Sequence, residues 1–353
     1  MGKHDAEKEK KKGNALKVMG IIFLVILAIV VIIAGAGLGF VYSKLGKITV
    51  EELDETAVGI SQETEERLSG YRNIAIFGID SRADDYGLGN RSDCIIIASL
   101  NEKTKDIKLI SVYRDTYLQI EEKGKEVLDK ATHAYSYGGA QNAVKMLNTN
   151  LDLNITEYVT VNFDAVIAAV DAMGGITIDI DKAEIEYING YINSTSQSSG
   201  VKSSLITKVG KQTLDGVQAV AYSRIRYTAG GDYKRTERMR TVIEAMLSKA
   251  KTLGLGKLNK LVDTIIPRIS TNITGTEILA LAPSIASFNI TESMGWPYKT
   301  QGTQTGTYYG IPVTLESNVV QLHKEVFEQS DYVINDKVKN ISDQIVKKYG
   351  YTK

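Results

Sequence analysis

Short apolar runs alternate with amphipathic stretches along most of the chain after residue 71. Runs bounded by glycine or polar turn residues predict β-strands at 73–77, 94–100, 107–112, 158–162, 176–180, 288–293 and 311–315. Apolar residues three or four positions apart predict helices at 142–147, 163–173, 214–222, 241–253, 257–266, 276–286 and 316–329. Because strands alternate with helices, we expect an α/β fold, a layered α-β-α sandwich around a central mixed β-sheet.

Some stretches show neither pattern. Residues 183–208 are rich in tyrosine, asparagine and serine, which predicts an insertion or mobile loop. Residues 331–353 are charged and predict a C-terminal tail that frays. Gly138 and Gly139 precede the helix predicted at 142–147 and mark its start. One folded domain is therefore expected at residues 71–330.

One apolar segment is longer than all the others. Residues 18–41 carry no charged side chain over 24 positions, long enough to cross a bilayer. The lysine-rich segment before it favours a cytoplasmic N-terminus. We expect a single-pass cell-membrane protein with a cytoplasmic tail at 1–17, an anchor at 18–41, an acidic stalk at 42–70 and an extracytoplasmic domain. The small residues at 34–36 leave a cleaved signal peptide as the alternative.

Composition excludes several classes of function. The 42 basic and 42 acidic residues cancel, so net charge gives no support for nucleic-acid binding. Cys94 is the single cysteine, which excludes an intrachain disulfide, and the three histidines are too scattered to suggest a zinc site. No Ser-His-Asp set, Cys-His pair or Walker loop is recognisable, so catalysis by a protein nucleophile is not favoured.

The most basic stretch, residues 222–240, holds five arginines. Arg224 and Arg226 are two positions apart and would face the same way on an extended segment. Arg235 and Arg238 are three apart, as on one face of a helix. Guanidinium binds phosphate in bidentate fashion, so these two groups, on either side of a glycine-containing break, can surround a small polyanion. A solvated basic helix is the alternative.

Charged side chains also stand at the ends of the first three predicted strands. These are Asp80, Arg91, Asp93, Arg114 and Asp115. All of them can reach one edge of the sheet, where open α/β sheets bind ligands. Two carboxylates among arginines suit a diphosphate with a divalent cation, because magnesium takes one or two protein carboxylates and completes its shell with water and phosphate oxygens. Taken alone, each of these residues is also what an ordinary turn residue, loop cap or local ion pair would look like.

The order and spacing of six motifs resemble the LytR-CpsA-Psr family of bacterial cell-envelope phosphotransferases. The similarity covers residues 71–250 strongly and extends more loosely to about 330. The motifs are Gly78-Ile-Asp-Ser-Arg82, Arg91-Ser-Asp93, Ser111-Val-Tyr-Arg-Asp115, Lys130-Ala-Thr-His-Ala-Tyr-Ser-Tyr-Gly-Gly139, Val170-Asp-Ala-Met-Gly-Gly-Ile-Thr-Ile-Asp179, and Leu214-Asp-Gly-Val-Gln-Ala-Val-Ala-Tyr-Ser-Arg-Ile-Arg226 with Lys234-Arg-Thr-Glu-Arg238.

The resemblance implies an enzyme that moves a glycopolymer phosphate (teichoic acid, capsule or a related wall polymer) from a polyprenyl-diphosphate lipid to a peptidoglycan hydroxyl, with pyrophosphatase side activity. It implies that Asp80 and Asp93 hold Mg²⁺, or alternatively Mn²⁺. The residues that it implies bind the diphosphate are Arg91, Arg114, Arg224, Arg226, Arg235 and Arg238. Those that it implies are catalytic are Arg114, Asp115, Arg224 and Arg226. Membrane lipid is an expected partner, and nucleic acid is not.

Two positions depart from the family pattern. Tyr113 stands where the family usually has proline, which alters the rigidity of the loop, and Met239 stands where members often have glutamine. Arg238 or Arg240 is expected to supply the polar interaction that a methionine side chain does not make.

Several roles stay open. Asp93, Asp115 and His133 are the candidates for removing a proton from the acceptor, and for His133 a structural hydrogen-bonding role is the favoured interpretation. Two non-enzymatic classes also remain: a binder of prenyl-phosphate lipids that senses envelope state, and a scaffold or regulator. A cytoplasmic tail of about 17 residues is too short for a DNA-binding domain.

Overall fold

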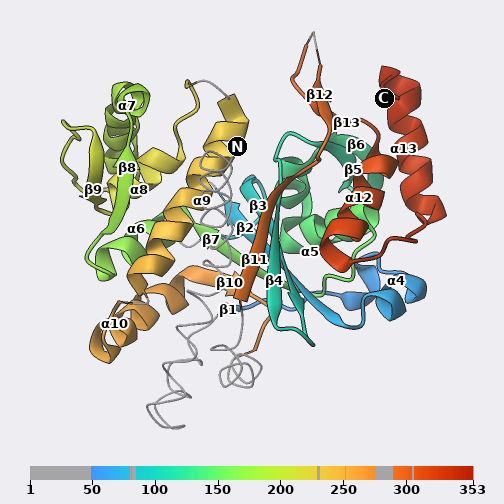
Figure 1. Cartoon of the computed structure of the whole chain (residues 1–353), viewed down its shortest axis with the longest axis horizontal. Coiled ribbons are helices and arrows are strands. Elements are labelled where there is room, and N and C mark those ends of the chain that lie inside the picture. The colour runs from blue at the N-terminus through green and yellow to red at the C-terminus, as the bar shows by residue number, and fades with distance from the viewer. Residues whose placement is uncertain are drawn as a thin grey trace, which may run out of the picture. The chain divides into compact units, whose positions relative to one another are not determined.

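The computed structural model describes residues 49–79, 81, 85–228, 231–250, 252–274, 289–303 and 306–352. Their helices and strands are shown in Figure 1 and fall into two compact units. Unit 1 comprises Met1–Val50, Arg82–Asp85 and Val161–Ser293, and unit 2 comprises Glu51–Ser81, Tyr86–Thr160 and Met294–Lys353. The fold is mixed α/β with a central mixed sheet, since that sheet contains both parallel and antiparallel strand pairs.

An antiparallel meander of three strands forms the sheet of unit 2. It consists of β2 (Tyr71–Ile79), β3 (Ser92–Asn101) and β4 (Asp106–Val112), and β7 (Glu157–Asn162) neighbours β2. Most side chains of β2 and β3 are buried whichever face they point to, so both faces of the sheet are covered. This explains why these strands appear in the sequence as continuous apolar runs. The four strand predictions are confirmed.

A hairpin of β5 (Tyr117–Glu122) and β6 (Lys125–Lys130) is absent from the sequence prediction. Its two-residue turn, Lys123–Gly124, has positive φ at both positions, as tight hairpin turns require. Helix α5 (Ala131–Leu151) follows directly, so it begins earlier than the predicted 142–147. Gly138 and Gly139 adopt non-helical angles within α5 and kink the helix rather than start it.

Both ends of unit 2 correct the predicted domain limits. Within the predicted stalk, Val58 and Leu68 are fully buried, and α4 (Gln62–Arg67) belongs to the folded unit. The predicted fraying tail contains α13 (Asp336–Tyr349), which buries one apolar face in the core of unit 2. In Figure 1, α13 lies beside α12 (Leu315–Phe327). Helix α12 confirms the helix predicted at 316–329. Most charged side chains of these stretches are exposed, which is why the sequence pattern hides their packed faces.

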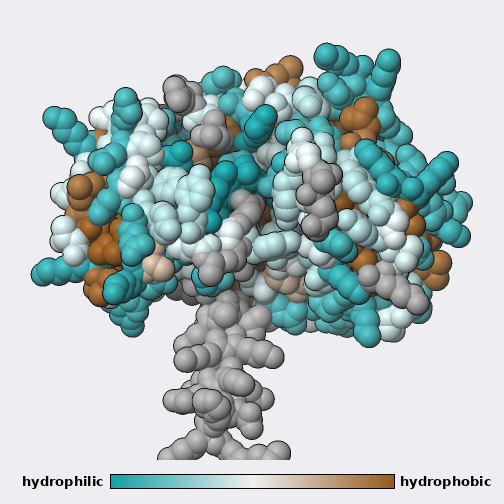
Figure 2. All heavy atoms as spheres, turned by 90° about the horizontal axis from the view of Figure 1, so that it is seen from above, coloured by the Kyte–Doolittle hydropathy of each residue, from teal (hydrophilic) through white to brown (hydrophobic). Residues whose placement is uncertain are grey.

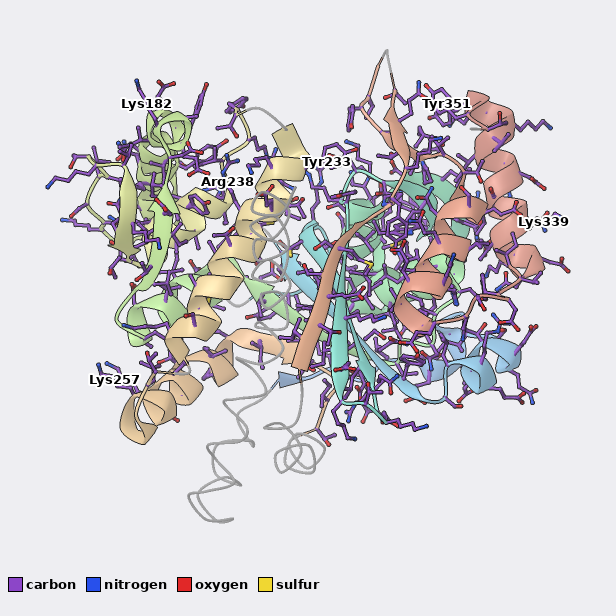
Figure 3. All side chains as sticks on the ribbon, in the orientation of Figure 1. Lys182, Tyr233, Arg238, Lys257, Lys339 and Tyr351 are labelled. Carbon is purple, nitrogen blue, oxygen red and sulfur yellow. The ribbon has the colours of Figure 1, made fainter. Side chains whose placement is uncertain are left out.

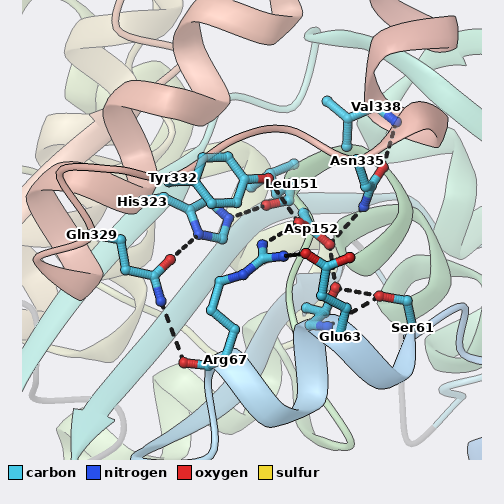
Figure 4. Close-up of polar contacts among 11 residues, drawn as sticks. Ser61, Glu63, Arg67, Leu151, Asp152, His323, Gln329, Tyr332, Asn335 and Val338 are labelled. Carbon is cyan, nitrogen blue, oxygen red and sulfur yellow. Dashed lines mark hydrogen bonds and ion pairs between the residues drawn. The ribbon is translucent and has the colours of Figure 1, made fainter.

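A buried carboxylate ties the N- and C-terminal segments of unit 2 together, as Figure 4 shows. Asp152 follows α5 in a left-handed conformation and is 3% exposed. It accepts hydrogen bonds from Arg67 at 3.0 Å, Tyr332 at 2.7 Å, Asn335 at 2.7 Å and the Thr64 hydroxyl. With four donors around it, the buried charge is satisfied, and α4 is held to the segment before α13.

Helix α7 (Lys182–Ser199) in unit 1 corrects the loop predicted at 183–208. A capping box formed by Asp181 and Glu184 starts the helix, and Gly200, at a φ of 72°, ends it. Ile188 and Ile192 are fully buried on one face. The serine- and asparagine-rich sequence hides this helix because only that narrow stripe is apolar.

Other predictions for unit 1 are confirmed by α6 (Phe163–Ala172), β8 (Ile176–Ile180) and α10 (Leu255–Ile265). The helix predicted at 214–222 is confirmed by α8 (Gly216–Ser223), which β9 (Gly210–Leu214) precedes. The helix predicted at 241–253 is the second half of α9 (Gly231–Ala250), which begins earlier and ends at residue 250. The remaining elements are β1 (Thr49–Val50), η1 (Glu55–Ala57), η2 (Ile266–Arg268), β10 (Ile269–Thr271), β11 (Asn289–Trp296), β12 (Thr300–Gly302) and β13 (Gly310–Pro312).

Two predicted elements, the anchor at 18–41 and the helix at 276–286, lie outside the described residues. Among the helices that are described, none combines the length and the apolar character needed to cross a membrane. The face drawn in Figure 2 is mainly hydrophilic, and its hydrophobic residues form small separate groups.

Candidate functional site

Antiparallel pairing in unit 2 brings the start of β3 next to the end of β4. Asp93 lies at an irregularity in the β2–β3 register, where Cys94 pairs with Gly78 and Ser92 pairs with Ile79. Gly78 permits this close approach, because a Cβ there would lie 2.8 Å from the Cβ of Cys94. Arg114 is the second residue after β4, so the fold places it beside Asp93, as the sequence predicts.

Four charged side chains of unit 2 form an alternating chain of ion pairs. Arg114 Nη1 lies 2.7 Å from Asp93 Oδ1, and Arg114 Nε lies 3.4 Å from Asp115 Oδ2. Lys130 Nζ lies 2.6 Å from the other oxygen of Asp115. All four side chains are between 13% and 18% exposed, so the two cations are partly desolvated yet reachable from solvent. In this ionic row the two carboxylates balance the charge of Arg114 and Lys130, and these two cations are the groups suited to binding an anion such as phosphate.

Lys130 is the member of the ionic row that the sequence-based prediction of site residues misses. It is the last residue of β6 and the residue before α5, and its ammonium lies 5.7 Å from the centre of the Tyr309 ring. The sequence feature that could have identified Lys130 as a site residue is its position at the start of the motif at 130–139. The unpredicted β5–β6 hairpin is what carries it to Asp115.

A second polar group of unit 2 surrounds Asp129. His133 Nδ1 lies 2.7 Å from Asp129 Oδ2, and the Tyr137 hydroxyl donates to the same oxygen at 3.4 Å. Burial raises the pKa of Asp129, but hydrogen bonds from His133 and from the Lys130 backbone outweigh it and leave the pKa below its ordinary value. Arg91 is exposed, and its positive charge acts on the Tyr137 hydroxyl. Asp129 is therefore an ionised acceptor that orients its neighbours.

Arg224 of unit 1 is held between aromatic rings. Its guanidinium lies 5.6 Å from the centre of the Phe163 ring and 5.7 Å from that of Tyr191. Its Nη1 donates to the Thr195 hydroxyl at 2.9 Å. Arg224 ends α8, and Arg226 two residues later is half-buried. The unpredicted helix α7 thus supplies two of the groups that hold Arg224.

Two arginines of α9, Arg235 and Arg238, are buried. Arg235 is 1% exposed and Arg238 is 2% exposed. Arg238, labelled in Figure 3, donates to Glu184 at 2.8 Å, to the carbonyl of Ile225 at 3.1 Å and to the Thr228 hydroxyl at 2.6 Å. Since its three nitrogens are directed at protein acceptors, Arg238 braces the segment that carries Arg226. Diphosphate binding by Arg238 stays a prediction.

The model of the LytR_cpsA_psr family matches residues 40–325. The chain belongs to this family. It is 33% identical to the polyisoprenyl-teichoic acid–peptidoglycan teichoic acid transferase TagU of Enterococcus faecalis over 243 residues, 67% of this chain and 73% of the relative. It is 27% identical to the corresponding transferase TagT of Bacillus subtilis over 317 residues, 86% of this chain and 93% of the relative.

Solved structures agree with the family assignment. A crystal structure of a Streptococcus agalactiae protein superposes with a TM-score of 0.64 at 23% identity, covering 82% of this chain and 97% of that one, and shows the same fold. The crystal structure of TagV from B. subtilis gives a TM-score of 0.56 at 26% identity, covering 75% of this chain and 98% of that one.

Tyr113, the first of the two expected departures from the family pattern, has two structural consequences. Its N–H donates to the carbonyl of Trp296 at 2.9 Å, a bond that proline cannot make. Its ring also lies against Gly295, where a Cβ would approach the Tyr113 hydroxyl oxygen to 2.0 Å. The backbone around Arg114 is thus fixed by hydrogen bonding and packing. At the second departure, Met239 is half-buried on α9, and the side chain of Arg240 lies outside the described residues.

The predicted metal site is only partly within the described residues. Asp80 lies outside them, and within them no group of three or more histidine, cysteine, aspartate or glutamate side chains could hold a metal ion. Asp93, a partly buried carboxylate, is the predicted ligand that the structure places. An oxygen donor of this kind fits Mg²⁺.

Proposed function

We propose that this chain transfers a glycopolymer phosphate, of the teichoic acid or a related wall-polymer class, from a polyprenyl-diphosphate carrier to peptidoglycan. Membership of the LytR_cpsA_psr family supports this, as does the transferase activity for which its relatives TagU and TagT are named. The observation that carries the proposal is the position of Arg114 between two carboxylates at the end of β4.

The ionic row suits phosphoryl transfer because that reaction depends on positioning and charge stabilisation more than on covalent chemistry by the protein. Asp93 and Asp115 hold the guanidinium of Arg114 in one orientation before substrate arrives. Arg114 and Lys130 then stabilise the charge that builds on the phosphoryl oxygens. Arg91 binds the diphosphate from its exposed position in unit 2. For Arg224, Arg226 and Arg235 in unit 1, diphosphate binding stays a prediction, and so does a catalytic role for the first two.

Asp93, together with Asp80, would hold Mg²⁺ or Mn²⁺. A bound cation neutralises part of the diphosphate charge and so favours attack on phosphorus. Asp93 also accepts the hydrogen bond from Arg114 described above. We expect transfer to stop when a chelator removes divalent ions. Hydrolysis of the same diphosphate, with water in place of the acceptor hydroxyl, is the expected side activity.

We also propose that residues 18–41 anchor the chain in the cell membrane, with the α-β-α layered domain outside. Peptidoglycan lies outside the membrane, so the proposed acceptor requires this orientation. Protease added to intact cells should digest the domain and leave residues 1–17 protected. Protection of the domain would refute the orientation.

The test of function uses the full chain with a short prenyl-diphosphate disaccharide as donor and a peptidoglycan oligosaccharide as acceptor. Release of prenyl phosphate and labelling of the oligosaccharide are followed with and without magnesium. Arg114→Ala should lower transfer by about 10²–10³-fold, the usual effect of losing one charge-stabilising donor. Arg72→Ala is the matched control, since Arg72 is also partly buried and ion-paired on a strand, with Glu157.

Three outcomes separate the interpretations. Transfer that needs magnesium and Arg114 supports the proposal. Donor binding without transfer by the wild type favours the envelope sensor. Equal activity of the Arg114 and Arg72 variants would show that the ionic row is not the reacting site.

A further inference from the structure

Attack by a hydroxyl on phosphorus requires a group that accepts the hydroxyl proton. Asp93, Asp115 and His133 are the three candidates from the sequence. Asp93 accepts a hydrogen bond from Arg114, and the two oxygens of Asp115 face Arg114 and Lys130. Both carboxylates are thus directed at cations that they hold in place. His133 is the candidate that remains.

His133 and Asp129 form a dyad with defined proton positions. An ionised carboxylate only accepts hydrogen bonds, so Nδ1 of His133 donates to Asp129 Oδ2 across the 2.7 Å contact. This tautomer leaves Nε2 as an acceptor, which has no hydrogen bond among the described residues. The two side chains are 19% and 20% exposed, so the dyad is in contact with solvent.

His323, in the same unit, shows the contrasting arrangement. It is fully buried, and its ring nitrogens contact the Gln329 side chain at 2.9 Å and the carbonyl of Leu151 at 3.0 Å. Both nitrogens are therefore used within the protein, and His323 has a structural role. His133 differs because Nε2 has no hydrogen-bond partner among the described residues, so a structural role accounts for only one of its two ring nitrogens.

The dyad adjoins the ionic row. Lys130 and His133 are three residues apart at the start of α5, a spacing that puts them on one side of the helix. Backbone hydrogen bonds from Thr132 to Arg114, 3.0 Å, and from Ala131 to Thr116, 2.9 Å, fasten this turn to the segment that follows β4. Arg114 and Lys130, which are proposed to bind phosphate, and Nε2 of His133 thus lie on two segments of unit 2 that are hydrogen-bonded to each other.

We propose that His133 is the general base of the transfer and that Asp129 is its positioning residue; this rests on the proposed function. The acceptor oxygen forms a bond to the sugar-linked phosphorus while the bond from that phosphorus to the prenyl-phosphate oxygen breaks. The hydroxyl proton passes to Nε2 of His133. Prenyl phosphate leaves as an anion, and the imidazolium, being partly exposed, returns its proton to water.

The groups around the dyad favour this division of roles. Tyr137 on α5 donates to Asp129, and Tyr309, in the segment before β13, interacts with the same carboxylate. Burial first, and then the charge of Asp129, raise the pKa of both hydroxyls, so they remain protonated donors. The other charges nearby are those of Lys130, Arg91 and Glu122. A negative Asp129 stabilises the imidazolium that proton transfer creates.

The test compares transfer rates against pH for the full-length wild type and for His133→Gln, with the short donor and oligosaccharide acceptor. General-base catalysis typically contributes 10²–10⁴-fold, so we expect kcat to fall by about 100-fold or more. Affinity for a short prenyl diphosphate with magnesium should not change. The wild-type rate should drop at acidic pH as the base is protonated, and His133→Gln should lack this drop.

Two further measurements distinguish a base from a structural residue. With an acidic alcohol such as trifluoroethanol as acceptor, the defect of His133→Gln should shrink, because less proton removal is needed in the transition state. Asp129→Asn should lower kcat, because the imidazolium loses the carboxylate that stabilises it.

Wild-type pH dependence retained in an active His133→Gln variant would overturn the assignment. So would a defect equal for both acceptors, or one confined to donor affinity. A wild type that binds donor and never transfers would refute the proposed function itself, and the general base with it.

Discussion

Replacing Arg238 with methionine tests whether this arginine is structural. The Arg238 side chain is 2% exposed and that of its partner Glu184 is 5% exposed, with 2.8 Å between Nε and Oε1. Methionine fills much of the space but leaves the Glu184 carboxylate buried without its cation. Removal of one member of a buried ion pair costs about 3–5 kcal/mol. The carbonyl of Ile225 and the Thr228 hydroxyl would also lose their donor.

The predicted effect is large enough for thermal denaturation followed by circular dichroism. A destabilisation of 1 kcal/mol lowers Tm by about 2–4 °C in domains of 150–250 residues, so we expect a decrease of roughly 6–20 °C. The matched control is Lys234→Met on the same helix, where the pair with Glu237 is exposed and contributes about 1 kcal/mol or less.

A second substitution identifies the cause. Glu184→Gln removes the buried charge yet keeps the side chain that caps α7, where Glu184 accepts from the Asp181 N–H at 3.0 Å. Combined with Arg238→Met, it should restore most of the lost stability, because the two residues act as one pair. If Arg238→Met had wild-type Tm and lost only donor affinity, Arg238 would be a phosphate ligand after all and the structural argument would be wrong.

Two further predictions concern stability. Gly295→Ala should lower the free energy of unfolding by about 1–3 kcal/mol, because the added methyl group overpacks against the Tyr113 ring. In denaturant titrations, adding Tyr113→Ala should remove most of this penalty. A Gly295→Ala variant of wild-type stability would contradict the packing. Burial holds the pKa of His323 below its ordinary value of 6.5. Below about pH 6.5 the unfolded chain therefore binds a proton at this histidine more readily than the folded chain does, so the free energy of unfolding should decrease as pH falls. His323→Gln should flatten this decrease in urea titrations at several pH values.

The sequence alone predicted most strands and several helices, because a segment's own apolar pattern records how it is buried. β2, β3 and β4 are covered on both faces, and their continuous apolar runs were sufficient to place them. The elements that the sequence did not predict carry weaker local signals. In α7 the apolar stripe is narrow among polar residues, and in β6 all six side chains are half-buried or exposed.

For the candidate site, too, the sequence predicted some features and the tertiary structure decided others. Motif order was enough to select Asp93, Arg114 and Asp115 and to indicate the family, since residue type and spacing are properties of the chain itself. Which side chains meet was decided by tertiary structure. The β5–β6 hairpin brings Lys130 to Asp115, and packing of α9 in unit 1 pairs Arg238 with Glu184, 54 residues away. A charged residue looks the same in sequence whether it faces solvent, substrate or a buried partner, and only the folded chain determines which of these surrounds it.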